Sequence, residues 1–303
     1  MQMSNQSQLE TLIQINTDDI LGALGLSQLQ IGRRWVEYSC RGVARRFAQQ
    51  VLAFDRSVAE VGLTCASLKM LLVLQNQLSV HGVENIPAQG PVCFLSNHPG
   101  LTDTLALFAS IPSTNLQILA ADRPFLRALN HTNQHLIYID EKKRENLQAV
   151  RLSIKHLQSK GALLTFPAGR IEPDPTILTG AVESLQSWSQ SVELFARTVQ
   201  ETSFIPVLVS GVLNPRAQHS PIRYLRRSAK DREWLAAMLQ ILIPAYQAVH
   251  VQVDFGEPIL ASLFPRKSKG LMNEVKQQME ELITARTERP AMKKKMILAV
   301  DSP

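Results

Sequence analysis

The sequence has few cysteines, few aromatic residues and no long hydrophobic run. Its 303 residues include three cysteines, an odd number without Cys-x-x-Cys spacing, which excludes a disulfide framework and is typical of a reducing compartment. Aromatic residues make up 6% of the chain, too few for an obvious platform on which single-stranded nucleic acid could stack. The remaining composition, with 45% hydrophobic and 19% charged residues, is that of a globular protein.

No segment has the composition of a membrane span, which needs about 20 mostly apolar residues. The best candidate, 61–80, contains Lys69 and several polar side chains, and the polar start of the chain, 1–8, is no secretory signal peptide. We therefore expect a cytoplasmic protein and leave open its peripheral attachment to the inner face of a membrane.

Hydrophobic periodicity divides the chain into two parts. Residues 1–80 have helical periodicity, with a helix start signal at Thr17, a stop signal at Gly25 and helical stretches over 28–59 and 61–78. Beyond His81, short apolar runs alternate with helical segments. The runs predicted as strands are 92–96, 116–120, 136–140, 162–166, 204–211 and 249–255, and the predicted helices are 103–110, 124–130, 145–160, 180–200, 233–246 and 271–285.

This alternation is typical of an α/β fold, in which helices cover the faces of a sheet. We predict a mixed central sheet flanked by helices and preceded by a small all-helical N-terminal domain. The predicted boundaries are 1–80 for the helical domain, 81–287 for the α/β domain and 288–303 for a basic C-terminal tail.

The first candidate site follows the predicted strand 92–96. Asn97 and His98 come directly after this strand, and a Pro-Gly turn leads to Asp103 at the start of the next helix. This spacing can bring the Asp103 carboxylate to one imidazole nitrogen of His98, which leaves the other nitrogen as a general base. The alternative is that Asp103 only caps the helix and that His98 only hydrogen-bonds within the turn.

Two further predicted strands also end in segments suited to anion binding. Strand 162–166 leads into Phe166-Pro167-Ala168-Gly169-Arg170, where glycine lets the backbone approach a ligand and arginine offers a planar fork for phosphate or carboxylate. Strand 136–140 leads into Glu141-Lys142-Lys143-Arg144, a cationic cluster that can hold a phosphate. The alternatives are an ordinary surface turn for the first segment and a solvated helix start for the second.

In this order, the segments resemble the motifs of the glycerolipid acyltransferase superfamily, which includes lysophosphatidic acid and glycerol-3-phosphate acyltransferases. The similarity covers about 80–212, beginning with His81-Gly82-Val83-Glu84-Asn85-Ile86-Pro87 and including Phe204-Ile205-Pro206-Val207 near its end. The helical leader and the segment Gly169-Arg170-x-x-Pro173-Asp174-Pro175 are similar to the soluble plastid-type glycerol-3-phosphate enzymes.

The resemblance implies transfer of a fatty acyl group from acyl-CoA or acyl-carrier protein to a hydroxyl of a glycerol-phosphate or lysophospholipid-type acceptor. His98 and Asp103 are then the catalytic pair, with His98 as general base, and no cofactor is implied beyond the acyl thioester co-substrate. The implied substrate-binding residues are Asn97, Lys142, Lys143, Arg144, Phe166, Pro167, Gly169 and Arg170.

Part of the acceptor-binding pattern differs from the usual one. Ala168 stands where the superfamily has glutamate, and Glu172 stands where the plastid-type pattern has a second arginine. Two alternatives to a transferase follow: a catalytically silent protein that binds a lipid or thioester on the same fold, and a hydrolase in which His98 activates water on the thioester.

Positive charge is concentrated in two segments outside these motifs. Residues 28–59 contain six arginines against Glu37 and Asp55, and residues 215–232 contain six basic residues against Asp231. Anionic lipid head groups attract such bases, each of which contributes about 1 kcal/mol near the surface. We expect an anionic membrane surface as a partner, and favour contact with the membrane or the acyl donor for 215–232 but a solvated helix face for 28–59. Nucleic acid is not needed to explain the net charge of +6.

Cysteine and histidine give no further site. Cys93 lies within a predicted strand, which favours a core position over a nucleophile. His131 and His135 are four residues apart, but the residues between them indicate a loop, and no third ligand is near them in the sequence. The sequence therefore predicts no metal site.

Overall fold

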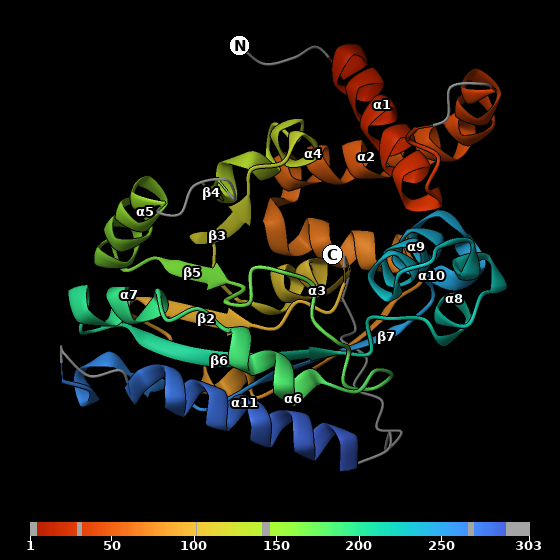
Figure 1. Cartoon of the computed structure of the whole chain (residues 1–303). Helices are drawn as coiled ribbons and strands as arrows, with labels where there is room; N and C mark the ends of the chain where they lie inside the picture. Colours follow the sequence, from red (N-terminus) through yellow and green to blue (C-terminus); the bar gives the residue numbers. More distant parts are fainter. Residues whose placement is uncertain (1–4, 29–31, 101, 141–145, 266–269, 289–303) are drawn as a thin grey trace.

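The computed structural model describes residues 5–28, 32–100, 102–140, 146–265 and 270–288. Within these residues an eight-stranded mixed sheet forms the centre of the molecule, in the order β1-β7-β6-β2-β5-β3-β4, with β8 paired to β6 (Figure 1). The strands are β1 (Gln77–His81), β2 (Val92–Ser96), β3 (Leu116–Ala121), β4 (Leu136–Ile139), β5 (Ala162–Thr165), β6 (Ser203–Ser210), β7 (His250–Phe255) and β8 (Ile259–Leu260). The strands from β2 to β6 are parallel, and β7 runs antiparallel to β6, which confirms the predicted mixed sheet.

Helices flank the sheet on both faces, as predicted. Figure 1 shows α3 above the sheet and α11 beneath it. The helices are α1 (Asn5–Leu24), α2 (Arg33–Val73), α3 (Thr102–Ser110), α4 (Pro124–Arg127), α5 (Leu147–Gln158), α6 (Ala181–Ser184), α7 (Val192–Thr198), α8 (Pro215–Gln218), α9 (Ala229–Leu242), α10 (Pro244–Gln247) and α11 (Gly270–Glu288). Short 3₁₀ helices are η1 (Val83–Asn85), η2 (Thr132–His135), η3 (Leu185–Ser187), η4 (Pro221–Leu225) and η5 (Ala261–Leu263).

Strand β2 is buried on both faces of the sheet. Its side chains alternate, so Val92 and Phe94 join a core with α2 and α3, whereas Cys93 and Leu95 join a second core with α5, α7 and α11. Because both faces are covered, the strand is a continuous apolar run, which is why its position could be predicted. Burying each large apolar side chain contributes roughly 1.5–3 kcal/mol, which makes this strand a firm support for the loop that follows it.

Helix α2 connects the N-terminal helical region to the sheet. Its first half packs against α1 through a cluster that includes Leu12 and Ala48, while Phe54 and Met70 belong to the core above the sheet. The two halves meet at Gly62, whose non-helical backbone (φ 80°, ψ 167°) kinks the helix. The helical region precedes the sheet as expected, and the division into domains at residue 80 stays a prediction.

Two predicted features of the helical region are wrong. Thr17 does not start a helix, because α1 already begins at Asn5 and the Thr17 hydroxyl bonds the carbonyl of Ile13 within it. The predicted helix 61–78 is too long: α2 ends at Val73, Gln75 takes a left-handed conformation, and the following residues pair with β7 as β1. An edge strand of this kind depends on a partner that is distant in the sequence.

Two predicted helices of the α/β part are interrupted. The segment 180–200 forms α6, η3 and α7, since the backbone is extended at Trp188 between them. The segment 233–246 is divided into α9 and α10 because Pro244 holds the preceding Ile243 in an extended conformation. The predicted tail lies outside the described residues apart from Glu288, where α11 ends.

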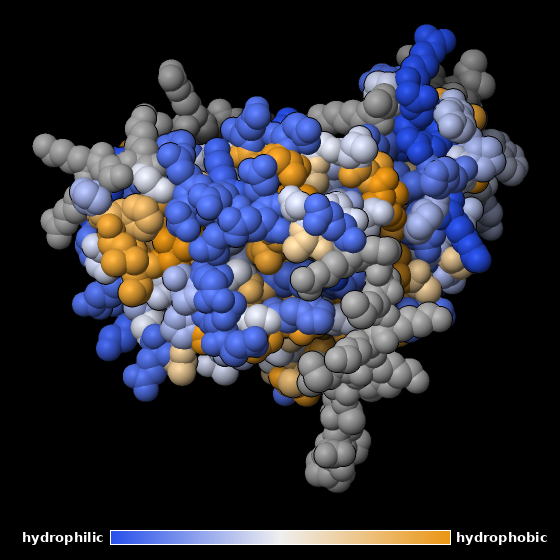
Figure 2. Space-filling model, turned by 90° about the horizontal axis from the view of Figure 1, so that it is seen from below, coloured by the Kyte–Doolittle hydropathy of each residue, from blue (hydrophilic) through white to orange (hydrophobic). Residues whose placement is uncertain are grey.

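The underside of the molecule, seen in Figure 2, is mostly hydrophilic across its middle, with separate groups of hydrophobic residues on both sides. Helix α11 beneath the sheet is amphipathic, and its buried residues Met272, Val275, Met279 and Ile283 face the sheet. In the described ranges, no helix combines the length and the apolar character that crossing a membrane requires.

Candidate active site

Strands β2, β5 and β6 are parallel and end at the same edge of the sheet, where three loops meet. The loop after β2 bonds the loop after β5, since the Glu172 N–H donates to the His98 carbonyl at 2.9 Å. The loop after β5 bonds the loop after β6, since the Val212 N–H donates to the Asp174 carboxylate at 2.7 Å. Two of the sequence segments predicted to form the site, after β2 and after β5, therefore lie together.

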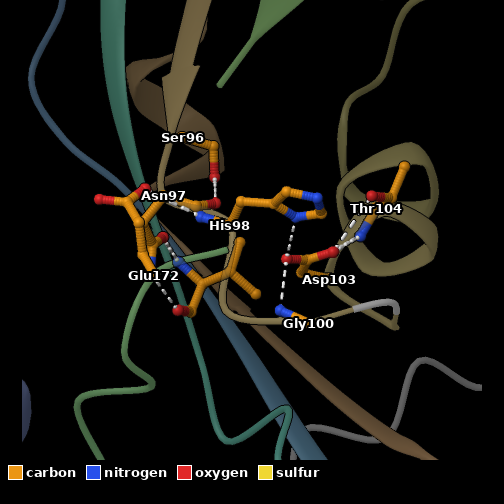
Figure 3. Close-up of polar contacts among 8 residues, drawn as sticks. Ser96, Asn97, His98, Gly100, Asp103, Thr104 and Glu172 are labelled. Carbon is orange, nitrogen blue, oxygen red and sulfur yellow. Dashed lines mark hydrogen bonds and ion pairs between the residues drawn. The ribbon is translucent and has the colours of Figure 1, made fainter. Parts of the chain in front are cut away.

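His98 and Asp103 form a close pair at this edge (Figure 3). Nδ1 of His98 lies 2.7 Å from Oδ2 of Asp103, whose carboxylate is fully buried, while the His98 side chain is 24% exposed. The carboxylate also accepts the N–H groups of Gly100 at 3.0 Å and Thr104 at 2.5 Å. These bonds fix the carboxylate at the start of α3, so Asp103 both stabilises the local turn and orients the imidazole. With Nδ1 protonated toward Asp103, Nε2 is the nitrogen that can accept a proton.

The surroundings of His98 favour its protonated form. Burial acts to lower the pKa of His98. The Asp103 carboxylate raises this pKa through its charge and its hydrogen bond, and the charge of Glu172 raises it further. The net result is a pKa above the ordinary histidine value. His98 is therefore a stronger base than a free imidazole.

The loop after β5 borders the imidazole on one side. The Phe166 ring lies 4.5 Å from the His98 ring, measured between centroids, and Pro167 is buried beside it. Gly169 has a left-handed backbone (φ 62°) and donates its N–H to the Phe166 carbonyl, which turns the chain so that the exposed side chain of Arg170 follows. This turn leaves the guanidinium of Arg170 available to an anion.

Asn97, predicted to bind substrate, is occupied by the backbone of β6. Its amide nitrogen donates to the Val209 carbonyl at 2.9 Å, and its amide oxygen accepts the Val209 N–H at 2.8 Å. The side chain is buried, with 4% of its surface exposed. Asn97 therefore joins the end of β2 to β6, and this placement indicates a structural contribution rather than contact with a ligand.

Two buried carboxylates complete the site: the sequence predicted an altered acceptor site at Glu172 and assigned no role to Asp174. Glu172 bonds the His98 N–H at 3.2 Å and is 3% exposed, so it is turned inward and does not face an acceptor. Asp174 accepts the N–H groups of Gly211 and Leu213 as well as that of Val212. The available signal was the segment Glu172-Pro173-Asp174-Pro175 directly after a strand-end loop, a place where polar side chains commonly bond loop backbone.

The remaining predicted residues do not alter this arrangement. Lys142, Lys143 and Arg144, the predicted phosphate-binding cluster, lie outside the described residues. Cys93 is fully buried in β2, and burial raises the pKa of its thiol, so its place is in the core. His135 ends the short helix η2, and across the described part of the chain no three or more His, Cys, Asp or Glu side chains cluster as a metal site would require.

Comparison with known proteins agrees with the motifs. Residues 77–210 match the family model described as Acyltransferase, a segment that contains both His98 and Asp103. This match supports the resemblance to the glycerolipid acyltransferase superfamily, and it covers the part of the chain in which the motifs lie. No curated protein sequence matches the chain.

Among solved structures, the chain is similar to the 1-acyl-sn-glycerophosphate (LPA) acyltransferase PlsC from Thermotoga maritima. The two share 16% sequence identity over 93% of this chain and 94% of that one, with a TM-score of 0.43. The resemblance to the superfamily therefore rests on the matched segment and its motifs.

We expect the D103N variant to lower the pKa of His98, because burial then acts on the imidazole without the adjacent negative charge. NMR titration of ¹³C-labelled histidine, with the His98 signal assigned by its loss in H98A, measures this directly. The matched control is D122N, which removes an exposed carboxylate that pairs with Arg127. An unchanged His98 titration in D103N would contradict the pairing.

Proposed function

We propose that this protein transfers a fatty acyl group from an acyl thioester, acyl-CoA or acyl-carrier protein, to a hydroxyl of a glycerol-phosphate or lysophospholipid-type acceptor. The observation that carries the proposal is the His98–Asp103 pair, in which Nδ1 lies 2.7 Å from Oδ2. The pair follows the carboxyl end of β2, within the segment that matches the Acyltransferase model. The imidazole is partly exposed and its partner is buried, which is the arrangement that an oriented general base requires.

In the proposed reaction, Nε2 of His98 takes the proton of the acceptor hydroxyl as its oxygen attacks the thioester carbonyl carbon. The buried Asp103 carboxylate stabilises the imidazolium that forms. The tetrahedral intermediate then breaks its carbon–sulfur bond, and the imidazolium returns the proton to the thiolate, which yields an ester and a free thiol. Proton transfer by a positioned side chain contributes about 10²–10⁴-fold to the rate.

Backbone N–H groups of the loop after β5 are the proposed donors to the oxyanion of this intermediate. Gly169 is not among them, because its N–H bonds the Phe166 carbonyl at 3.0 Å. Pro167 has no N–H, so Ala168 and Arg170 supply the donors of this loop. One such donor contributes about 10²–10³-fold in enzymes that use an oxyanion hole.

The first test measures free thiol release from acyl-CoA, with and without glycerol-3-phosphate, lysophosphatidate or a non-phosphorylated alcohol. We expect release that depends on the acceptor, that falls about 10²–10⁴-fold in H98A, and that declines as the pH is lowered through the raised pKa of His98. The H156A variant, which alters a histidine distant from the site, serves as the control. Release without acceptor would indicate a hydrolase, no release a binding protein, and full activity in folded H98A a different mechanism.

Arg170 is proposed to hold the phosphate of the acceptor. Its side chain is exposed directly after the Gly169 turn, two residues before the buried Glu172. A guanidinium binds phosphate oxygens through two parallel hydrogen bonds, which suits an acceptor of this kind. Lys142, Lys143 and Arg144 remain proposed as further phosphate ligands from the sequence.

In R170A we expect the KM for a phosphorylated acceptor to rise roughly tenfold to a hundredfold, the factor for a lost hydrogen bond to a charged group. The KM for a non-phosphorylated alcohol should not change, because the lost contact is to phosphate. The control is R151A, which removes an exposed arginine on α5. Comparing the steady-state kinetics of the two variants separates loss of the phosphate contact from a general loss of charge. If R170A and the wild type have equal KM values for the phosphorylated acceptor, Arg170 does not bind its phosphate.

A second proposal concerns the anionic membrane surface expected from the sequence. Tyr224 and Leu225 in η4 are each 69% exposed, and Arg223 and Arg232 flank the Tyr224 ring at 5.9 and 5.7 Å. Exposed aromatic and aliphatic side chains among arginines suit a lipid interface, where rings lie at the level of the head groups. In the other basic segment Arg41 and Arg45 pair with Glu10, which favours a structural use of that charge.

The double substitution Y224A/L225S should weaken binding to vesicles of phosphatidylglycerol and phosphatidylcholine, because it removes the apolar part of this surface. Sedimentation at increasing salt should show that wild-type binding to these vesicles declines as charges are screened. The control is L263S, which changes a leucine that is 72% exposed in η5. Equal binding to vesicles of pure phosphatidylcholine, or no effect of the double substitution, would exclude this surface.

A further inference from the structure

Glu172 is a buried carboxylate whose Oε2 and backbone bond the loop that carries His98. Its own N–H donates to the His98 carbonyl at 2.9 Å, and its Oε2 accepts the His98 N–H at 3.2 Å, so the two residues are joined by a reciprocal pair of bonds (Figure 3). The link spans 74 positions of the sequence and connects the loop after β5 to the loop that carries the base. Glu172 thus fixes the backbone of His98 directly.

The other carboxylate oxygen is held from the opposite side. Oε1 of Glu172 accepts the indole N–H of Trp188 at 2.8 Å, and the Ser184 hydroxyl lies at the same distance. Trp188 is buried and stands at the break between η3 and α7, where the backbone is extended. The interruption of the predicted helix 180–200 therefore brings the indole to Glu172, and a continuous helix would place this side chain elsewhere.

Glu172 has no cationic partner of the ordinary kind. In the part of the chain that the structure describes, it forms no ion pair with lysine or arginine, and His98 is the one positive group whose charge acts on it. Burial raises the pKa of Glu172 above its ordinary value, and the hydrogen bonds from Trp188, Ser184 and the His98 backbone oppose this only in part. A buried carboxylate without a counter-charge is costly, and three hydrogen-bond donors reduce that cost.

We propose that Glu172 is a positioning residue for His98: it holds the backbone of His98 in place, and its charge stabilises the imidazolium form. The inference rests on the proposed function, in which His98 becomes positively charged as it takes the proton of the acceptor. The attraction between Glu172 and the imidazole exists only in that protonated state, so it stabilises the transition state more than the resting enzyme. The carboxylates that face His98 are Asp103 from α3 and Glu172 from the loop after β5.

The test compares E172Q with E193Q. Glutamine has the shape of glutamate but no charge, and Glu193 is a matched control because it is equally buried and bonds the Met272 N–H in the second core. In E172Q we expect a lower His98 pKa by NMR titration and an acid limb of kcat/KM displaced to lower pH. We also expect kcat to fall roughly tenfold to a hundredfold, the scale on which small misplacement of a catalytic group acts. E193Q should leave all three unchanged.

A folded E172Q enzyme whose His98 titrates as in wild type would overturn the proposal, even if its activity is reduced, because a purely structural residue would behave in this way. If E172Q does not fold, W188F is measured: it keeps the charge but removes one donor that holds it. There we expect a lower kcat with a smaller displacement of the acid limb, and wild-type kinetics would overturn the proposal. The titration needs no substrate, so its result is independent of whether H98A abolishes acyl transfer.

Discussion

The parallel pairing of β2 with β5 and β6 is the constraint on which the site depends. Because the three strands run in the same direction, their carboxyl ends lie at one edge and their following loops meet there. β2 lies between the other two and is buried on both faces, so the residues after Ser96 leave the sheet from a firmly packed support. The imidazole of His98 and the Phe166 ring are neighbours for this reason, although 68 positions separate them in the sequence.

Buried carboxylates hold these loops together. A loop without regular structure must find partners for its backbone N–H groups, and here acidic side chains supply them. Asp103 bonds Gly100 and Thr104, while Asp174 bonds the backbone from Gly211 to Leu213. Each carboxylate is buried, so the backbone groups that it bonds are held in place without a contribution from the bound substrate. Pre-organisation of this kind is what an acid–base site needs.

Glu172 gives the departure from the superfamily pattern a physical meaning. The sequence suggested that a glutamate in place of the second arginine changes the charge presented to the acceptor. The side chain is instead turned inward toward Trp188, and the charge acts on His98. Arg170 is then the exposed arginine of this loop.

Local and continuous features of the fold could be predicted from the sequence. Periodicity was sufficient to predict β2 and β6, because each is a short apolar run. Spacing was sufficient to predict the pairing of His98 with Asp103, because the two residues are close in the sequence. β1 was missed because it is an edge strand, with both its ends exposed and no fully buried residue, and its pairing with β7 depends on residues near the other end of the chain. The break at Trp188 was missed because the helical pattern around it is intact and only the distant Glu172 gives the indole a partner.

The sequence by itself therefore predicted the alternation of strands and helices and the pairing of His98 with Asp103, and its motifs implied the class of reaction. Only the tertiary structure decided that Asn97 binds the backbone of β6, that Glu172 is buried against His98, and that Asp174 joins two loops. These contacts connect residues that are 37 to 112 positions apart, and the direction of a carboxylate or amide at such a distance is set by which strands pair, not by its neighbours in the chain.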